Sequence, residues 1–518
     1  MEVSFSYINI LLSFAALFLI KLFFFTNNNR KKKKLPPSPP ALPFIGHLYL
    51  FKNPLHHTLS RISARYGPIT FLRFGSRPVV VVNSRAIAEE CFTTHDVAFA
   101  NRVHLPSQKH TTFNYANIGT ANYGSHWRNT RRIAAVELLS THRLLLSSSA
   151  RTDEVRHMAR GLLLNWKKIA GSQGSTFVKV ELKSRLFELS LNVMMRIMAG
   201  KRYFGEAAEG SEDARQFREV VEEIFARGGA TTLSDFLPIL GLFQGVNKAM
   251  KRLKAVIDDF SQRLVDEHKK ENKDSQGERT KKTMIDHLLS LRETEPDSYS
   301  DQTIKSICMS LLMAGTDTTS NTVEWAMSLL LNNPHTLTKA AVEIETHVGK
   351  ERLINESDLS NLPYLHCILK ETLRLYPGAP LLVPHESRDD IVLNNYDIPC
   401  GTMLLVNAYV IHRDPATWDE PDEFKPERFE EKKEEEKYMI AFGNGRRRCP
   451  GEGLAIRDVG IMLGTLLQCF EWRRVGDEAV DLGEGSGLTL PKAISLEAMC
   501  KPRENMEKVL MEDLVEVE

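Results

Sequence analysis

Apolar residues along this chain recur more often with helical spacing than with strand spacing. The segments at 304–331 and 359–375 carry long apolar-rich patterns and predict helices. Shorter runs rich in β-branched residues at 69–74, 78–82 and 391–406 lie beside glycine or asparagine turns and predict strands. The pattern therefore predicts a mainly α fold with a minor β component.

The most apolar segment is residues 8–25, which Asn9, Ser13 and Lys21 interrupt. A bilayer span needs about 20 mostly apolar residues. A basic cluster at 30–34 follows, and such clusters are retained on the cytoplasmic side. A cleaved secretory signal is the alternative, but its basic residues would precede the apolar run. We predict that residues 1–26 form a single transmembrane anchor with the rest of the chain in the cytosol.

Proline is frequent in residues 35–43 and fixes φ, so this stretch predicts a stiff, extended spacer. A ligand for a proline-recognising module has a similar composition. We divide the rest of the chain into a basic cluster and Pro-rich hinge at 27–44, one large domain at 45–505 and a C-terminal tail at 506–518.

Composition narrows the function classes. The 518 residues carry a net charge of +1, which gives no electrostatic case for binding nucleic acid. The seven cysteines include no Cys-x-x-Cys pair, so neither a zinc ribbon nor a disulfide framework is predicted. Gly443 and Gly445 lack the third glycine of a dinucleotide fingerprint, because Arg448 occupies its place.

The candidate chemistry begins at Cys449, which lies in a glycine-rich loop at 442–451 and follows three arginines. Glycine lets the backbone turn tightly and approach a flat ligand. Backbone N–H groups and positive charge favour a thiolate, which is a ligand for soft metal centres. A basic surface loop is the alternative.

A second unusual segment, Ala314 to Thr319, lies inside the predicted helix at 304–331 and reads Ala-Gly-Thr-Asp-Thr-Thr. Glycine and threonine are poor residues for a helix interior. Such departures from good helix sequence are expected at functional sites. The alternative is a kinked helix whose threonines bond back to backbone carbonyls.

The two segments together resemble cytochromes P450. The haem-ligating pattern Phe-x-x-Gly-x-Arg-x-Cys-x-Gly is matched from Phe442 to Gly451, and the oxygen-activating pattern Ala-Gly-x-Asp-Thr-Thr from Ala314 to Thr319. The resemblance implies a cytochrome P450 haem domain at 45–505 that binds haem b through Cys449 as the axial iron ligand.

The resemblance also implies the roles of other residues. Gly315 would leave room for dioxygen above the iron, and Asp317 and Thr318 would supply protons. Residues implied to bind the haem, several of them at its propionates, are Trp127, Arg131, His385, Arg447 and Phe442. A loop histidine such as His385 is more often merely hydrogen-bonded.

A structural cluster is implied by Glu371 and Arg374, which lie three residues apart on one helical face, together with Arg428 downstream. Glu-x-x-Arg alone is a weak signal because surface ion pairs of this kind are common. In the family these three residues hold the cysteine loop in place.

The implied activity is that of a monooxygenase on the endoplasmic reticulum membrane. Its electrons would come from NADPH through NADPH–cytochrome P450 reductase, because the chain has no nucleotide-binding segment. Arg132, Arg446 and Arg448 are candidate contacts for that partner.

Further sequence segments resemble the plant microsomal family 81; they lie at 123–129, 201–205, 235–238 and 381–385. Its members act mostly on phenolics, including flavonoids, isoflavonoids and benzophenone- or xanthone-type compounds, by aromatic hydroxylation, phenol coupling or methylenedioxy-bridge formation. The predicted pocket residues are Val103, Phe113, Met313, Ala314, Ala379, Leu382 and Leu488.

Three alternatives remain at this stage. The substrate could be a terpenoid or a herbicide. A haem-thiolate isomerase would need no reductase, but such enzymes commonly lack the acid–threonine pair that is intact at Asp317 and Thr318. A haem sensor or membrane interaction protein would need no proton relay at all.

Overall fold

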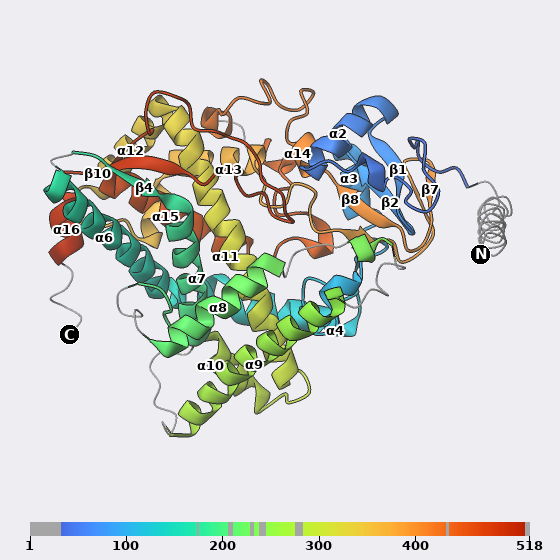
Figure 1. Cartoon of the computed structure of the whole chain (residues 1–518), viewed down its shortest axis with the longest axis horizontal. Helices are drawn as coiled ribbons and strands as arrows, with labels where there is room; N and C mark the ends of the chain where they lie inside the picture. Colours follow the sequence, from blue (N-terminus) through green and yellow to red (C-terminus); the bar gives the residue numbers. More distant parts are fainter. Residues whose placement is uncertain are drawn as a thin grey trace, which may run out of the picture.

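The computed structural model describes residues 33–173, 176–205, 211–227, 233–237, 245–274, 283–430 and 435–512. Long helices form one large part of the molecule, and most of the sheet lies in a smaller part beside α2 and α3 (Figure 1). The helices are α2 (Leu55–Tyr66), α3 (Arg85–Phe92), α4 (Ser125–Arg132), α5 (Thr141–Leu146), α6 (Ser148–Gln173), α7 (Leu182–Ala199), α8 (Glu212–Arg227), α9 (Gly245–Asp274), α10 (Met284–Arg292), α11 (Asp301–Asn332), α12 (Pro334–Val348), α13 (Pro363–Leu375), α14 (Ala408–Ile411), α15 (Glu452–Cys469) and α16 (Met506–Glu512). The strands are β1 (Ile69–Phe74), β2 (Arg77–Val82), β3 (Asn101–Arg102), β4 (Val178–Glu181), β5 (His385–Glu386), β6 (Ile391–Leu393), β7 (Tyr396–Ile398), β8 (Met403–Val406), β9 (Phe470–Arg473) and β10 (Glu497–Pro502).

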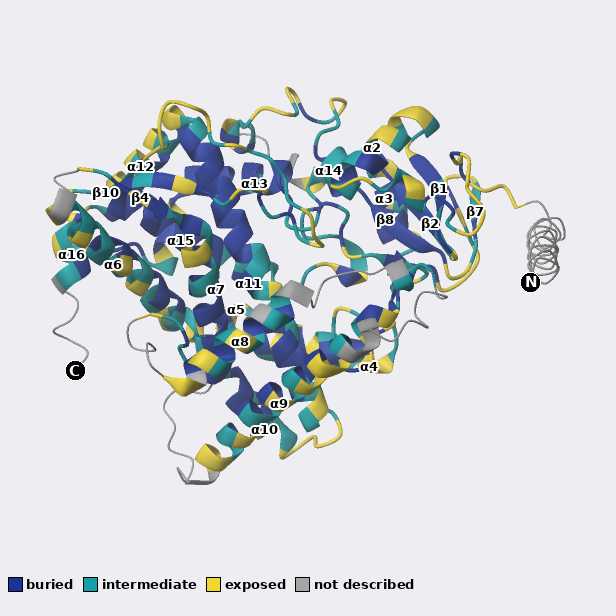
Figure 2. Cartoon of the chain, in the orientation of Figure 1, coloured by how far each residue is buried: buried dark blue, intermediate teal, exposed yellow. Residues whose placement is uncertain are grey.

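The central element of the helical part is α11, which packs against α7, α9, α13 and α15. Ser300 caps its N-terminus by accepting a hydrogen bond from the backbone N–H of Thr303. Most of its side chains are buried (Figure 2). Burial on nearly every side explains why the predicted helix at 304–331, which the structure confirms, has no continuous polar face.

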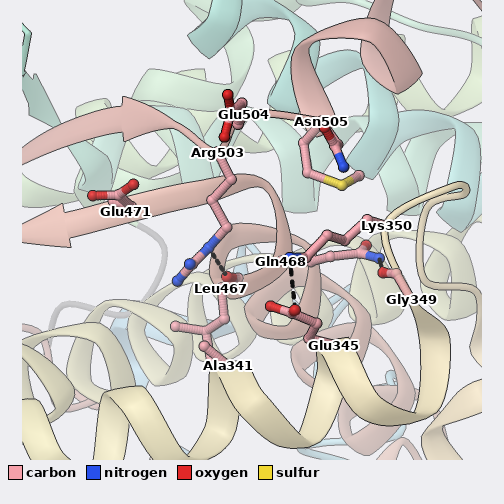
Figure 3. Close-up of a pocket in the computed structure, with 11 residues that line it drawn as sticks. Ala341, Glu345, Gly349, Lys350, Leu467, Gln468, Glu471, Arg503, Glu504 and Asn505 are labelled. Atoms are coloured by element: carbon pink, nitrogen blue, oxygen red, sulfur yellow. Dashed lines mark hydrogen bonds and ion pairs between the residues drawn. The ribbon is translucent and has the colours of Figure 1, made fainter.

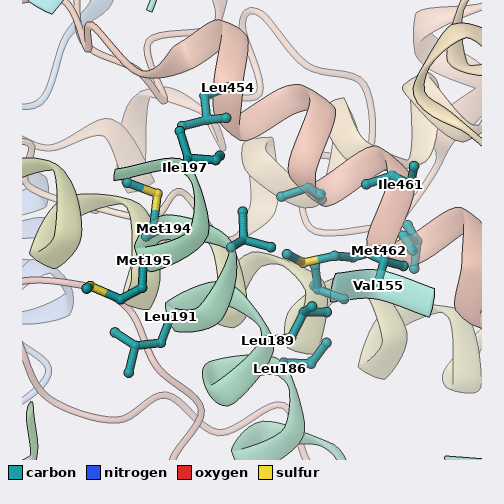
Figure 4. Close-up of a cluster of buried hydrophobic side chains, with 14 of the residues drawn as sticks. Val155, Leu186, Leu189, Leu191, Met194, Met195, Ile197, Leu454, Ile461 and Met462 are labelled. Atoms are coloured by element: carbon teal, nitrogen blue, oxygen red, sulfur yellow. The ribbon is translucent and has the colours of Figure 1, made fainter. Parts of the chain in front are cut away.

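The main hydrophobic core lies around α11, where leucine and methionine side chains of α7 and α15 meet. Figure 4 shows this cluster, with Val155 of α6 beside it. Close packing here fixes the distance between α11 and its neighbours, because core side chains interdigitate with few voids.

The five-stranded sheet has the order β1-β2-β8-β5-β3. The predicted hairpin is confirmed, with Ile69 opposite Val82 and β2 then pairing parallel to β8. The strands predicted at 391–406 are β6, β7 and β8. Asn394 and Asn395, at φ +47° and +62°, form the tight turn between β6 and β7, where asparagine tolerates the left-handed conformation.

Two predicted elements need correction. The helix predicted at 359–375 begins only at Pro363, because a separate 3-10 turn with its own cap at Asn355 occupies Glu356–Asn361. The loop predicted at 101–125 contains β3 and a 3-10 turn at Pro106–Lys109.

Contacts cross both predicted boundaries of the large domain. The backbone N–H of Phe71 donates to the carbonyl of Pro37 at 3.0 Å, so the Pro-rich stretch lies against β1. At the other end, Met506 and Leu510 of α16 are buried in the main core. The boundaries themselves stay predictions.

The predicted anchor at 1–26 lies outside the described residues, which begin at Lys33. Within the described parts of the chain, no helix combines the length and the apolar character that crossing a membrane requires.

Candidate functional site

The cysteine loop is held in a tight, left-handed turn just before α15. Gly443 and Gly445 have φ +71° and +65°, and a Cβ on Gly445 would lie 2.8 Å from the carbonyl oxygen of Phe92. The backbone N–H of Cys449 donates to the carbonyl of Phe442 at 2.8 Å, which closes the loop on itself. Glycine is therefore required here both for the backbone conformation and for the close approach to α3.

The electrostatics at Cys449 differ from the prediction. Burial raises the pKa of its thiol, although the backbone N–H of Gly451 and the charges of Arg131 and Arg448 oppose that rise. The loop alone therefore favours the thiol. The thiolate needs a bound metal cation, which deprotonates a coordinating thiol.

The cluster predicted from Glu-x-x-Arg is present, with Glu371 and Arg374 fully buried. Arg374 makes a bidentate ion pair with Glu371 at 2.7 and 2.8 Å, and Arg428 Nε reaches Glu371 at 3.0 Å. The remaining donors of Arg374 bind the carbonyl oxygens of His412, Pro421 and Glu423. All five guanidinium donors are thus satisfied, which lysine could not achieve.

His412 connects this cluster to the cysteine loop and was not predicted. Its Nε2 accepts a hydrogen bond from the backbone N–H of Ile440 at 2.9 Å, so Nδ1 carries the proton and donates to the carbonyl of Arg374 at 3.2 Å. Burial and the charges of Arg374 and Arg413 lower the pKa of His412 to about 3, so it is neutral. We call Glu371, Arg374, Arg428, His412 and the loop at 442–451 the cysteine support.

The other half of the site is one face of α11. Ala314 is exposed and Thr318 partly exposed midway along this otherwise buried helix. The Thr318 hydroxyl donates to the carbonyl of Ala314 at 2.6 Å, and Asp317 accepts a hydrogen bond from Thr489 at 2.6 Å. We call Ala314, Asp317, Thr318 and Thr489 the α11 face. It combines a small exposed side chain at Ala314 with polar groups at Asp317, Thr318 and Thr489.

Gly315 of α11 lies against Met194 of α7. A Cβ at this position would lie 2.7 Å from the sulfur and 3.1 Å from the terminal methyl of Met194 on α7. Gly315 therefore allows α11 and α7 to pack closely. The expectation that it leaves room for dioxygen stays a prediction, and the neighbouring Ala314 is the exposed small residue in this part of α11.

The residues predicted at the propionates come together. Trp127 of α4 is buried, and the Arg447 guanidinium stacks on its indole at 4.1 Å. Burial and the charge of Arg131 lower the pKa of Arg447 to about 9. Burial and the charges of Arg102 and Arg447 lower the pKa of His385, whose Nδ1 lies 2.7 Å from the carbonyl of Phe99.

Arg102 of β3 joins this group and was also missed by the sequence. Its guanidinium binds the carbonyls of Val383 and Pro384, but its buried Nε has no hydrogen-bond partner among the described residues. Burial and the charge of Arg447 lower its pKa. Burying several positive charges close together is unfavourable, and one of their N–H donors lacks a partner here. A ligand that carries carboxylates, as haem does, would satisfy both the charges and the donor.

The apolar residues predicted to line the substrate pocket belong to several packing clusters. Val103 packs in the cluster with β1 and β2, Leu382 in the cluster on the other side of the sheet, and Phe113 in the main core. Leu488 is exposed, Met313 packs at the edge of the main core and Ala379 is half-buried. Phe113 and Leu382 both have positive φ, a strained conformation that concentrates at functional sites.

A cavity of about 210 Å³ lies elsewhere, lined by Glu345, Gln468 and Arg503 among others (Figure 3). None of the residues predicted for the site borders it. It is therefore not the haem site.

The arginines predicted to face a reductase are each paired within the chain. Arg446 lies 3.2 Å from Asp96, and Arg448 lies 2.7 Å from Glu452. Arg132 lies 3.8 Å from both Glu137 and Glu295. Their positive charge is largely neutralised, which weakens the argument for an electrostatic docking patch.

Comparison with known proteins agrees with this site. The family model for Cytochrome P450 matches residues 36–497. "Cytochrome P450 81Q32" of Catharanthus roseus is 51% identical over 474 residues, which cover 91% of this chain and 92% of that protein. "(+)-piperitol/(+)-sesamin synthase CYP81Q2" of Sesamum radiatum is 46% identical over 514 residues, covering 98% and 99%. "Isoflavone 3'-hydroxylase" of Medicago truncatula is 47% identical over 468 residues, covering 90% and 92%.

The chain therefore belongs to the cytochrome P450 family, and within it to the plant family 81 group. A solved zebrafish cytochrome P450 with progesterone has a TM-score of 0.72 at 26% identity and covers 87% of this chain and 100% of that one. The predicted fold, the class of cytochrome P450 monooxygenase and the haem cofactor are confirmed.

Proposed function

We propose that this monooxygenase oxidises a phenolic plant metabolite, with two electrons delivered from NADPH by NADPH–cytochrome P450 reductase. The α11 face carries the proposal. Thr318 and Asp317 place a hydroxyl and a carboxylate beside the open surface at Ala314, which a haem protein without oxygen chemistry would not need.

The haem would be held from two directions. Cys449 would bind its iron, while Arg102, Arg131, Arg447, Trp127 and His385 would hold its carboxylates. When bound, the thiolate-ligated haem supplies the activation of dioxygen. The chain's own contribution is to orient the ring, to exclude water and to deliver protons through Thr318 and Asp317.

The proposed reaction is aromatic hydroxylation of a flavonoid, an isoflavonoid or a benzophenone- or xanthone-type compound. The relative named isoflavone 3'-hydroxylase supports hydroxylation of a flat phenolic. Methylenedioxy-bridge formation is a second candidate, because a relative that covers 98% of this chain is named a sesamin synthase.

We further propose that residues 1–26 anchor the protein in the endoplasmic reticulum membrane with the catalytic domain in the cytosol. The apolar run at 8–25 and the basic cluster at 30–34 support this orientation. Protease treatment of intact microsomes should digest the catalytic domain. A domain protected until detergent is added would contradict the orientation.

The activity is tested in microsomes that contain the protein and the reductase, incubated with a panel of phenolics and read by mass spectrometry. We expect a product that depends on NADPH and incorporates label from isotopically labelled oxygen. Thr318→Ala serves as the matched control with an intact haem site. A product formed without oxygen or reductase would instead indicate an isomerase.

A further inference from the structure

A cluster of two imidazoles and one carboxylate lies away from the haem site. His56 and His57 are the second and third residues of α2, and Glu484 belongs to the segment that follows β9. His56 Nε2 and His57 Nε2 lie 2.6 and 2.9 Å from the same oxygen of Glu484. Residues more than 400 positions apart in the chain thus converge on one point.

These three side chains form a ligand set suited to a borderline transition metal. Their ligand atoms all lie within 4.8 Å of one another. Two imidazole nitrogens and one carboxylate oxygen are typical ligands of Zn²⁺, with water completing the tetrahedral arrangement. The side chains of His56 and Glu484 are only 4% and 8% exposed, whereas that of His57 is 40% exposed, so an ion can enter from the solvent.

The surroundings hold the two imidazoles in place. The ring of Tyr409 lies 4.6 Å from His56 and 4.8 Å from His57, and Asn407 donates to the backbone carbonyl of His56 at 3.1 Å. Ligands that packing already fixes lose little freedom when an ion binds.

The local charge is compatible with a cation. Glu484 supplies the one carboxylate of the set, and both imidazole contacts converge on the same oxygen of that carboxylate. Arg413 is a further positive charge acting on Glu484; it stacks on Tyr409 at 3.7 Å and pairs with Asp422 at 3.3 Å. That ion pair reduces its repulsion of a metal ion.

We propose that His56, His57 and Glu484 form a binding site for a divalent transition-metal ion of the zinc class. Both imidazoles donate from Nε2 to the carboxylate in the hydrogen-bonded arrangement. When the ion binds, each ring carries its proton on Nδ1 and offers the Nε2 lone pair to the metal.

The bound ion stabilises the segment at 484–492, which contacts the α11 face. Glu484 and Lys492 form an isolated β-bridge, which closes residues 484–492 into a loop. Thr489 within this loop donates to Asp317. The metal site therefore fixes the base of the loop that holds the carboxylate of Asp317.

The site is tested on the purified holoenzyme, stripped with a chelator and titrated with Zn²⁺ in a calorimeter. Co²⁺ serves as a second probe, because its visible absorption reports nitrogen and oxygen ligands. We expect one ion per chain, with affinity that falls as the pH is lowered, since protons compete for the imidazole nitrogens.

The variants are His57→Gln and Glu484→Gln, with His142→Gln on α5 as an exposed control histidine. The first two should weaken binding by more than the roughly 10- to 100-fold that loss of an outer-shell partner costs. The control should bind like the wild type. The reduced carbon monoxide spectrum of each variant checks that the haem domain is folded.

Thermal unfolding gives an independent readout. Zn²⁺ should raise the unfolding midpoint of the wild type and of the His142→Gln variant but not that of the His57→Gln variant. Equal affinity in the wild type and the His57→Gln variant, or no binding to the wild type, would overturn the proposal.

Discussion

The cysteine support and the α11 face differ in burial and in how completely their polar groups are hydrogen-bonded. In the cysteine support, Glu371 and Arg374 are fully buried, every guanidinium donor of Arg374 has a partner, and His412 ties the cluster to the loop. On the α11 face, Asp317 and Thr318 make few hydrogen bonds and Ala314 is exposed.

This difference matches the tasks of the two regions. An axial ligand must stay in one position, and a buried, fully satisfied network gives that rigidity. A proton-delivering face must release and recover protons, so its groups need access and freedom to reorient. We therefore expect changes in the cysteine support to act on haem retention and changes on the α11 face to act on coupling.

The largest effect is expected from Glu371→Gln, which leaves Arg374 and Arg428 buried without their carboxylate. Breaking a buried ion pair on one side costs about 3–5 kcal/mol. We predict loss of most haem, measured by the ratio of Soret to protein absorbance, and a lower unfolding midpoint. Glu345→Gln is the control, because Glu345 pairs with Lys350 at an exposed site. Full haem content in the Glu371→Gln variant would contradict the claim that the cysteine support controls haem retention.

The second-largest effect is expected from a substitution on the α11 face. Thr318→Ala removes the hydroxyl that donates to Ala314 and should leave haem content unchanged. Loss of a positioned proton donor costs on the order of 10²-fold in rate. Oxygen consumed per product should rise and hydrogen peroxide should accumulate, whereas Thr318→Ser should restore coupling. Unchanged coupling in the alanine variant would argue against proton delivery by Thr318.

A smaller effect is expected at His412. His412→Ala leaves the backbone N–H of Ile440 without an acceptor, at a cost of about 1–3 kcal/mol. We predict faster conversion of the red-shifted carbon monoxide band to a shorter-wavelength form. His412→Gln should slow that conversion again, because its amide oxygen can replace Nε2. Equal rates in the wild type and the alanine variant would show that the link is not needed.

His412 also makes stability depend on pH. Its pKa is lowered from 6.5 to about 3, so between these values the unfolded chain binds a proton that the folded protein does not. Its stabilisation is complete above pH 6.5 and is lost as the pH falls toward 3. The difference in unfolding midpoint between the wild type and His412→Gln should therefore shrink on acidification, and other titrating groups cancel in that difference.

The smallest effect is expected from Gly315→Ala. The added methyl must displace the flexible end of Met194, so we predict a loss of about 1 kcal/mol in the free energy of unfolding. Coupling and haem content should be unchanged. A marked change in coupling would instead support the prediction that Gly315 leaves room for dioxygen.

The sequence predicted features that short motifs encode. The loop at Cys449, the glycine and threonine run in α11 and the Glu371–Arg374 pair depend on neighbours within a few residues, so their spacing is visible in one sequence. The hairpin at Gly75 was visible for the same reason.

Features that depend on distant contacts escaped prediction. His412 matters because Ile440 and Arg374 meet it in the fold, and Arg102 because Arg447 lies nearby. The side of α11 on which Gly315 lies is set by where α7 packs. Periodicity alone does not say which neighbour a helix face meets.

The most direct test of haem-thiolate chemistry at Cys449 is the reduced carbon monoxide difference spectrum of the wild type beside Cys449→Ser. Cys400→Ser is the matched control, because Cys400 is an exposed free thiol. We predict the red-shifted Soret band in the wild type and the control and its absence in Cys449→Ser. A red-shifted band that survives in Cys449→Ser would contradict the assignment of Cys449 as the iron ligand.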